Sequence, residues 1–187
     1  MLAYVFWHWK RAEIAAGDYE SRQRAFHDAL ASTSSSLVLG SYSAGVSNLS
    51  WVAEGSEAYE DWYLIGDFAA LGRLNEAAVS ASRAAPHAAA AAVAAGGTAG
   101  LYGLRRGAGL RQPRYAHWFA KPEGMTYDEL FTRLEPVVDA AEGALWMRQM
   151  VLGPASEFCL HAAAAVPMDD VFKPSVRALR PIWPQSA

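Results

Sequence analysis

Tyr4-Val5-Phe6-Trp7-His8-Trp9-Lys10 near the start of the chain is matched by Tyr115-Ala116-His117-Trp118-Phe119-Ala120-Lys121 in its second half. The two segments share Tyr, Trp and Lys at the same spacing. Three further pairs of segments follow in the same order: Asp18-Tyr19-Glu20 and Thr126-Tyr127-Asp128, Val38-Leu39-Gly40 and Val151-Leu152-Gly153, and Asp61-Trp62-Tyr63-Leu64 and Glu157-Phe158-Cys159-Leu160. We interpret the chain as a tandem repeat, with copies at residues 1–107 and 114–187 and a linker at 108–113.

Each copy contains the sequence patterns of strands and helices in a similar order. Runs rich in aromatic residues fit a half-buried pleated surface and predict strands. Asp18, Asp67 and the capping pair Thr126 and Glu129 predict helix starts, and Pro136 is expected to kink or end the last helix. The expected strands are 2–9, 37–43, 61–66 and 100–105 in the first copy, and 115–120, 145–152 and 157–162 in the second.

The order β-α-β-β-α-β in the first copy is that of a ferredoxin-like unit, an antiparallel sheet with helices on one face. Two such units can bury their bare faces against each other. The fold class is therefore α+β, with two βαββαβ repeats packed sheet to sheet as an intrachain barrel. The second copy is shorter, because Pro174 interrupts its last part and only 180–183 remains for a fourth strand. We leave open whether that strand exists.

The repeat, the unit order and the two Tyr-x-x-Trp-x-x-Lys segments resemble the dimeric α+β barrel superfamily, here as a tandem member. This resemblance covers nearly the whole chain, although its motifs are short. It implies a small-molecule site within the barrel. The superfamily includes cofactor-independent oxygenases, isomerases, and haem proteins that decompose chlorite or remove halogens, so the resemblance alone implies no single reaction.

Side chains on a strand alternate between its two faces. We expect Ala3, Val5, Trp7 and Trp9 to pack under the helices, and the other face of this strand to look into a cavity between the sheets. Aromatic walls with a few polar groups are typical of small-molecule pockets. The residues predicted to line this cavity are Tyr4, His8, Tyr63, Tyr115, His117, Arg148 and His161.

Two other interpretations of these residues stay open. Tyr and His also occur in ordinary cores, with their polar atoms bonded to the backbone. The second alternative is the reverse face assignment, in which Trp7 and Trp118 point inward and the histidines move to the helix side. The adjacent acids Glu60 and Asp61 are interpreted as solvated or capping residues, and Cys159 as a small buried hydrophobe.

Composition excludes several classes of protein. The chain has 187 residues, 52% of them hydrophobic, and a formal net charge of -3, so it lacks the cationic field of a nucleic-acid-binding protein. One cysteine allows no internal disulfide and suits a reducing compartment, and the alanine-rich run is too short to span a membrane. We expect a cytoplasmic protein with a small-molecule ligand, no nucleic-acid or membrane partner, no metal and no cofactor. A homodimer stays open.

Three functions fit this outline. In the first, the chain is an oxygenase or isomerase for an apolar or aromatic molecule. His8 or His117 acts as general base and Arg148 stabilises developing negative charge, while Tyr4, Tyr63, Tyr115 and His161 bind the ligand. In the second, the cavity holds a ligand or a haem without turnover, and a haem would need a histidine as axial ligand. In the third, the interior is filled and the domain is structural.

Overall fold

The computed structural model describes residues 1–32, 38–52, 57–109 and 112–184. Its first half contains four strands and three helices, together with a short 3-10 turn before α3. They are β1 (Leu2–Lys10), α1 (Ala16–Ala31), β2 (Gly40–Val46), β3 (Ala58–Ile65), α2 (Phe68–Ala78), α3 (Ala84–Ala91) and β4 (Ala94–Arg106). The predicted strand start at Leu37, and residues 110–111 of the predicted linker, lie outside the described residues.

The second half repeats this order in a shorter form. It comprises β5 (Tyr115–Phe119), α4 (Tyr127–Ala140), β6 (Ala144–Arg148), β7 (Phe158–Ala162), β8 (Ser175–Ala178) and β9 (Arg180–Trp183). The predicted capping box is confirmed, since Thr126 Oγ1 accepts from the Glu129 amide at 3.2 Å and Glu129 accepts from the Thr126 amide at 2.8 Å. Pro136 does not end α4, which continues to Ala140.

All nine strands belong to one antiparallel sheet in the order β8-β5-β7-β6-β4-β1-β3-β2-β9. Each half contributes four strands in the ferredoxin-like arrangement, β4-β1-β3-β2 and β8-β5-β7-β6. The halves join where β4 pairs with β6 and where β9 pairs with β2. Because only Leu179 separates β8 from β9, the two ends of the strand order are consecutive in the chain, and the sheet curls back toward itself as a barrel.

The shorter second copy does have a fourth strand. It is β8, which pairs with β5 from Tyr115↔Ala178 to Trp118↔Ser175. The segment predicted for that position, Arg180–Trp183, instead crosses to the first copy and pairs with β2. A single interrupted segment therefore supplies both the missing strand and the second junction between the halves.

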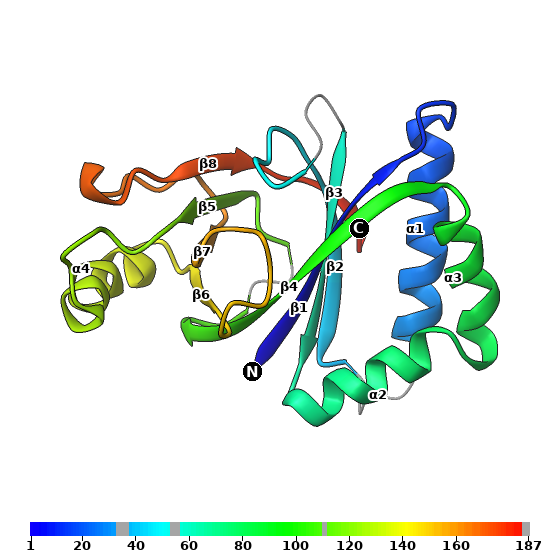
Figure 1. Ribbon diagram of the computed structural model, residues 1–187, viewed down its shortest axis with the longest axis horizontal. Coiled ribbons are helices and arrows are strands. Elements are labelled where there is room, and N and C mark those ends of the chain that lie inside the picture. Colours follow the sequence, from blue (N-terminus) through cyan, green and yellow to red (C-terminus); the bar gives the residue numbers. More distant parts are fainter. Residues whose placement is uncertain (33–37, 53–56, 110–111, 185–187) are drawn as a thin grey trace.

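The helices cover the outer faces of the two half-sheets, with α1, α2 and α3 on one side and α4 on the other (Figure 1). Between the half-sheets lies a core in which Trp7, Trp62, Trp118 and Trp146 are almost completely buried. The face predicted for β1 is therefore wrong: Ala3, Val5 and Trp7 point into the barrel, and the opposite side of β1 faces the helices. Both faces of this strand are apolar or aromatic, so alternation carried no signal of which one is inside.

Candidate functional site

A buried carboxylate with two imidazoles lies between the first half-sheet and α1. Asp61 Oδ2, on β3, is 3.2 Å from Nε2 of His8 on β1 and 3.3 Å from Nε2 of His27 on α1. All three side chains are at most 2% exposed. The Tyr63 hydroxyl donates to the same carboxylate oxygen at 3.0 Å. Strand alternation places Asp61 and Tyr63 on one face of β3, and β1 lies beside it in register.

Electrostatics keep this carboxylate ionised. Burial alone would raise the pKa of Asp61, but the charges and hydrogen bonds of His8 and His27 outweigh it and hold the pKa well below its ordinary value. A buried carboxylate needs a compensating positive charge, and the two imidazoles in contact with it can supply one. Both imidazoles therefore lie where they can stabilise the charge of this one carboxylate oxygen.

The second ring nitrogen of each histidine, Nδ1, lies close to a hydroxyl group. His8 Nδ1 is 2.6 Å from the Tyr19 hydroxyl, and His27 Nδ1 is 3.1 Å from the Ser41 hydroxyl. Polar contacts of 3.3 Å or less thus extend from Tyr19 through His8, Asp61 and His27 to Ser41. Such a chain can take a proton at one end while the central carboxylate stabilises the resulting imidazolium.

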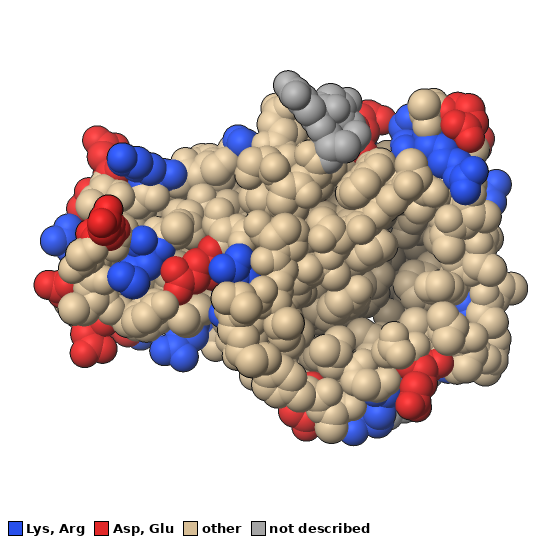
Figure 2. All heavy atoms as spheres, in the orientation of Figure 1, with Lys and Arg blue, Asp and Glu red and all other residues tan. Residues whose placement is uncertain are grey.

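Aromatic rings surround the histidines. Phe6 stacks on His8 with ring centroids 5.1 Å apart, and Tyr4 stacks on Tyr63 at 6.0 Å. Phe6 and Tyr4 are only partly buried. Figure 2 shows the surface hollowed between the half-sheet and the helices α2 and α3, with a wall made mostly of residues other than Lys, Arg, Asp and Glu. An uncharged aromatic molecule fits such surroundings.

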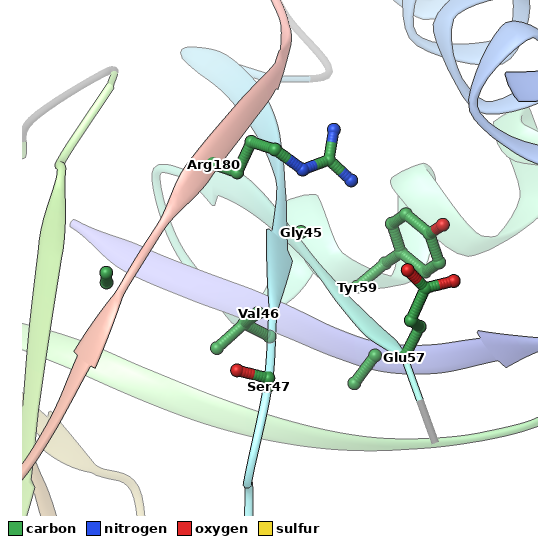
Figure 3. A pocket seen from close by; sticks show the side chains of 8 residues that line it. Gly45, Val46, Ser47, Glu57, Tyr59 and Arg180 are labelled. Carbon is green, nitrogen blue, oxygen red and sulfur yellow. The ribbon is translucent and has the colours of Figure 1, made fainter. Parts of the chain in front are cut away.

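A pocket of about 200 Å³ opens at the junction of β2, β3 and β9 (Figure 3). Arg180 lies over Gly45 there and donates to Glu20 at 2.6 Å. Tyr59, which lines the pocket, stacks on His8 with ring centroids 5.6 Å apart and an interplanar angle of 10°. One ring therefore separates this pocket from the His8 imidazole.

The space between the half-sheets, where the sequence predicted the cavity, is occupied by packed aromatic rings. Trp62 lies within 6.2 Å of Trp118 and 5.4 Å of Trp146, measured between ring centroids. Glu60 is buried among them and accepts hydrogen bonds from the indole N–H groups of Trp7 at 3.3 Å and Trp62 at 3.1 Å. The strongest candidate site is consequently on the helix side of the sheet.

The structure brings together three of the seven predicted site residues, Tyr4, His8 and Tyr63. The other four lie elsewhere. Nδ1 of His117 donates to the Leu160 carbonyl oxygen at 3.2 Å, and its Nε2 accepts from the Val166 amide at 3.0 Å. Burial lowers the pKa of His117. Arg148 donates to the carbonyls of Gly153 and Ala155. Tyr115 lies on β5, and His161 points into the barrel.

Sequence reasoning missed Asp61, His27 and Tyr19. The acidic pair at 60–61 was interpreted as solvated, yet both side chains are at most 1% exposed. The position of the acidic pair could have indicated its burial, because Tyr59 and Trp62 flank the pair within a strand that is buried along its whole length. A charge inside such a run needs partners. The spacing of residues 8, 27 and 61 in the sequence does not indicate that their side chains lie together.

The candidate site does not fit a metal or a haem. Within the described residues, no group of three or more His, Cys, Asp or Glu side chains is arranged to hold a metal ion. A haem iron needs a free imidazole nitrogen. Both ring nitrogens of His8, and both of His27, lie within 3.3 Å of a protein oxygen.

In the described part of the chain, no helix has the length and apolar character that crossing a membrane requires.

Comparison with known proteins shows the fold. No family model and no curated protein matches the sequence. A solved protein from Fusobacterium nucleatum, described as a "putative monooxygenase", superimposes with a TM-score of 0.65 at 11% identity over 97% of this chain and 92% of its own. A protein of the same description from Lactobacillus acidophilus gives 0.51 at 11% identity over 97% and 94%. The chain therefore has the α+β barrel-like fold of these proteins, and at this identity the likeness shows the fold alone.

Proposed function

We propose that this protein binds an uncharged aromatic molecule in the hollow between its first half-sheet and α2 and α3, and oxidises it with dioxygen without a cofactor. The observation that carries this proposal is the buried His8–Asp61–His27 cluster behind the partly buried rings of Tyr4 and Phe6. The two neighbours described as monooxygenases are compatible with it.

In the proposed reaction, His8 is the base and the Tyr19 hydroxyl, which is completely buried beside it, links it to a substrate that has displaced the surrounding side chains. An acidic C–H or O–H proton of the substrate passes to the Tyr19 oxygen as Tyr19 gives its own proton to His8 Nδ1, 2.6 Å away. Asp61 stabilises the imidazolium from the opposite side of the ring at 3.2 Å. Where the substrate carries an activated CH2 group, its carbanion can add to dioxygen, and loss of water from the hydroperoxide leaves a carbonyl group.

An isomerase would use the same base without dioxygen, and a binding protein would use only the aromatic wall. Oxygen uptake separates these alternatives. Purified protein is supplied with a panel of uncharged hydroxylated naphthalenes and anthracene derivatives, and dioxygen consumption is followed together with product formation. We expect uptake that Tyr19→Phe and His8→Gln abolish, and that Tyr115→Phe leaves unchanged because Tyr115 lies in the other half-sheet. Uptake that survives His8→Gln would contradict the proposal, and binding without uptake would favour the non-catalytic alternative.

A further inference from the structure

The barrel interior contains aromatic rings in continuous contact. Trp51, which is only partly buried, lies 5.5 Å from Trp7 and 5.1 Å from Trp118 between ring centroids. Trp118 lies 6.2 Å from Trp62, and Trp62 stacks on Tyr42 at 5.8 Å with an interplanar angle of 10°. A series of touching rings therefore connects the surface to one buried phenol.

Tyr42 differs from the neighbouring interior phenol in its hydrogen-bond partner. Its hydroxyl lies 3.0 Å from Nδ1 of His161, and both residues are at most 1% exposed. Tyr102, in the same core, donates at 2.9 Å to the carbonyl oxygen of Ser156. An imidazole nitrogen can accept a proton, whereas a peptide carbonyl is a very weak base. Only the first of these phenols can thus lose its proton when it loses an electron.

His161 is a neutral acceptor, and it takes the Tyr42 proton only once the phenol has been oxidised and has become a strong acid. Burial lowers the pKa of His161 to about 3, so the ring is neutral and its Nδ1 lone pair is available to Tyr42. Nε2 of the same ring is 4.0 Å from Glu60 Oε1 and has no hydrogen-bond partner among the described residues. Burial raises the pKa of Glu60 to about 7, so this carboxyl group can stabilise the imidazolium by its charge only above that pH, and it already accepts from the Trp62 indole.

We propose that the tryptophans of the barrel interior and the Tyr42–His161 pair form a relay that removes oxidising equivalents from the candidate site and holds them as a neutral tyrosyl radical. The use of the relay depends on the proposed oxygenase function, but its redox chemistry does not. Trp7 and Trp62 adjoin His8 and Tyr63 in the sequence and lie on the opposite face of the same strands. The relay therefore begins one sheet thickness from the aromatic wall of the candidate site.

The step balances as a one-electron transfer. When a substrate radical forms by loss of one electron to dioxygen and adds a second dioxygen, the resulting peroxyl radical accepts one electron and one solvent proton and becomes a hydroperoxide. The electron comes from Tyr42 through Trp62. The phenolic proton moves to His161 Nδ1, which leaves the neutral Tyr42 radical beside an imidazolium. A thiol in solution later returns one electron through Trp51 and is oxidised to a thiyl radical, and the proton goes back from His161 to Tyr42.

Flash oxidation tests the relay without any substrate, so it is independent of the oxygenase proposal. A photo-generated ruthenium(III) polypyridyl complex oxidises the protein from solution, and electron paramagnetic resonance with ring-deuterated tyrosine identifies the radical. We expect a tyrosyl signal in the unaltered protein. Tyr42→Phe loses this signal and leaves a shorter-lived tryptophanyl radical. His161→Gln loses it as well, because an amide accepts a hydrogen bond but not the proton.

Two conservative variants serve as controls. Tyr102→Phe keeps the signal, because its phenol has no base, and Tyr19→Phe keeps it, because Tyr19 lies on the helix side next to His8. Unfolding curves confirm that each variant is folded. A tyrosyl signal unchanged in Tyr42→Phe, or no tyrosyl radical in the unaltered protein, would overturn the relay.

Discussion

Glu60 and Asp61 are neighbours on β3, and their carboxylates lie on opposite faces of the sheet in opposite ionisation environments. Glu60 points into the barrel and accepts from two indoles, whereas Asp61 points toward α1 and contacts two imidazoles. Burial raises the pKa of Glu60 to about 7, and the histidines hold that of Asp61 well below its ordinary value. One strand thus separates a core stabilised by apolar packing from a polar cluster suited to proton transfer.

Replacing Asp61 by Asn should destabilise the protein strongly. The change leaves two buried imidazoles without their carboxylate, and breaking a buried ion pair in this way costs about 3–5 kcal/mol. Urea unfolding at neutral pH measures the loss. Asp139→Asn is the control, because Asp139 pairs with Arg106 on the surface at 2.6 Å, where solvent screens the pair, and this change should cost clearly less. Equal losses in the two variants would contradict the buried cluster.

The raised pKa of Glu60 predicts a pH-dependent component of stability. The protonated form is favoured in the folded state up to pH 7, while the unfolded chain ionises near 4.5. Stability is therefore greatest below the unfolded value and falls as pH rises between these two values. Glu60→Gln cannot ionise, so the free energy of unfolding of the unaltered protein minus that of the variant should fall by about 3 kcal/mol at most across this range.

Unfolding free energies of both proteins, measured from pH 4 to pH 8, test this predicted fall. The range brackets the pKa of Glu60 in the unfolded chain, about 4.5, and in the folded protein, about 7. His161 contributes the opposite slope, because burial lowers its pKa to about 3, but this contribution is expected to be similar in both proteins and to cancel largely in the difference. A difference that is constant with pH would contradict the placement of Glu60 in a dry core.

The turn after β4 should tolerate no side chain. Gly107 has φ +83°, and a Cβ there would overlap the carbonyl oxygen of Gly143. Gly124 has a similar φ of +77°, but its Cβ would meet nothing within 4 Å. Gly124→Ala should cost about 1 kcal/mol from backbone strain alone, and Gly107→Ala clearly more. Thermal unfolding of the two variants compares them, and equal melting temperatures would contradict the close contact between β4 and the segment before β6.

The repeat and its strand order could be predicted from sequence because aromatic runs and helix caps are local signals. The Thr126–Glu129 box and the Asp67 cap, which accepts from the Ala70 amide at 2.7 Å, are two examples. Asp18 shows the limit of such signals, since α1 begins at Ala16 and Asp18 lies within its first turn.

The side of the sheet could not be predicted. On β1, Trp7 and Phe6 are both large and apolar, so neither face looked like the exterior, and His8 was assigned to the wrong one. The cluster itself depends on contacts between residues far apart in the chain. His8 and Asp61 meet because β1 pairs with β3, and His27 joins them only when α1 packs on the same face.

Ligand-induced chemical shifts test the account most directly, because they tell the helix-side hollow from the barrel interior. The probe is an uncharged hydroxynaphthalene titrated into protein labelled in its aromatic rings and indole N–H groups. We predict shifts in the ring signals of Tyr4 and Phe6 and in the imidazole of His8, with the indole N–H signals of Trp118 and Trp146 unchanged. Shifts confined to those two indoles would place the ligand between the half-sheets and contradict the account.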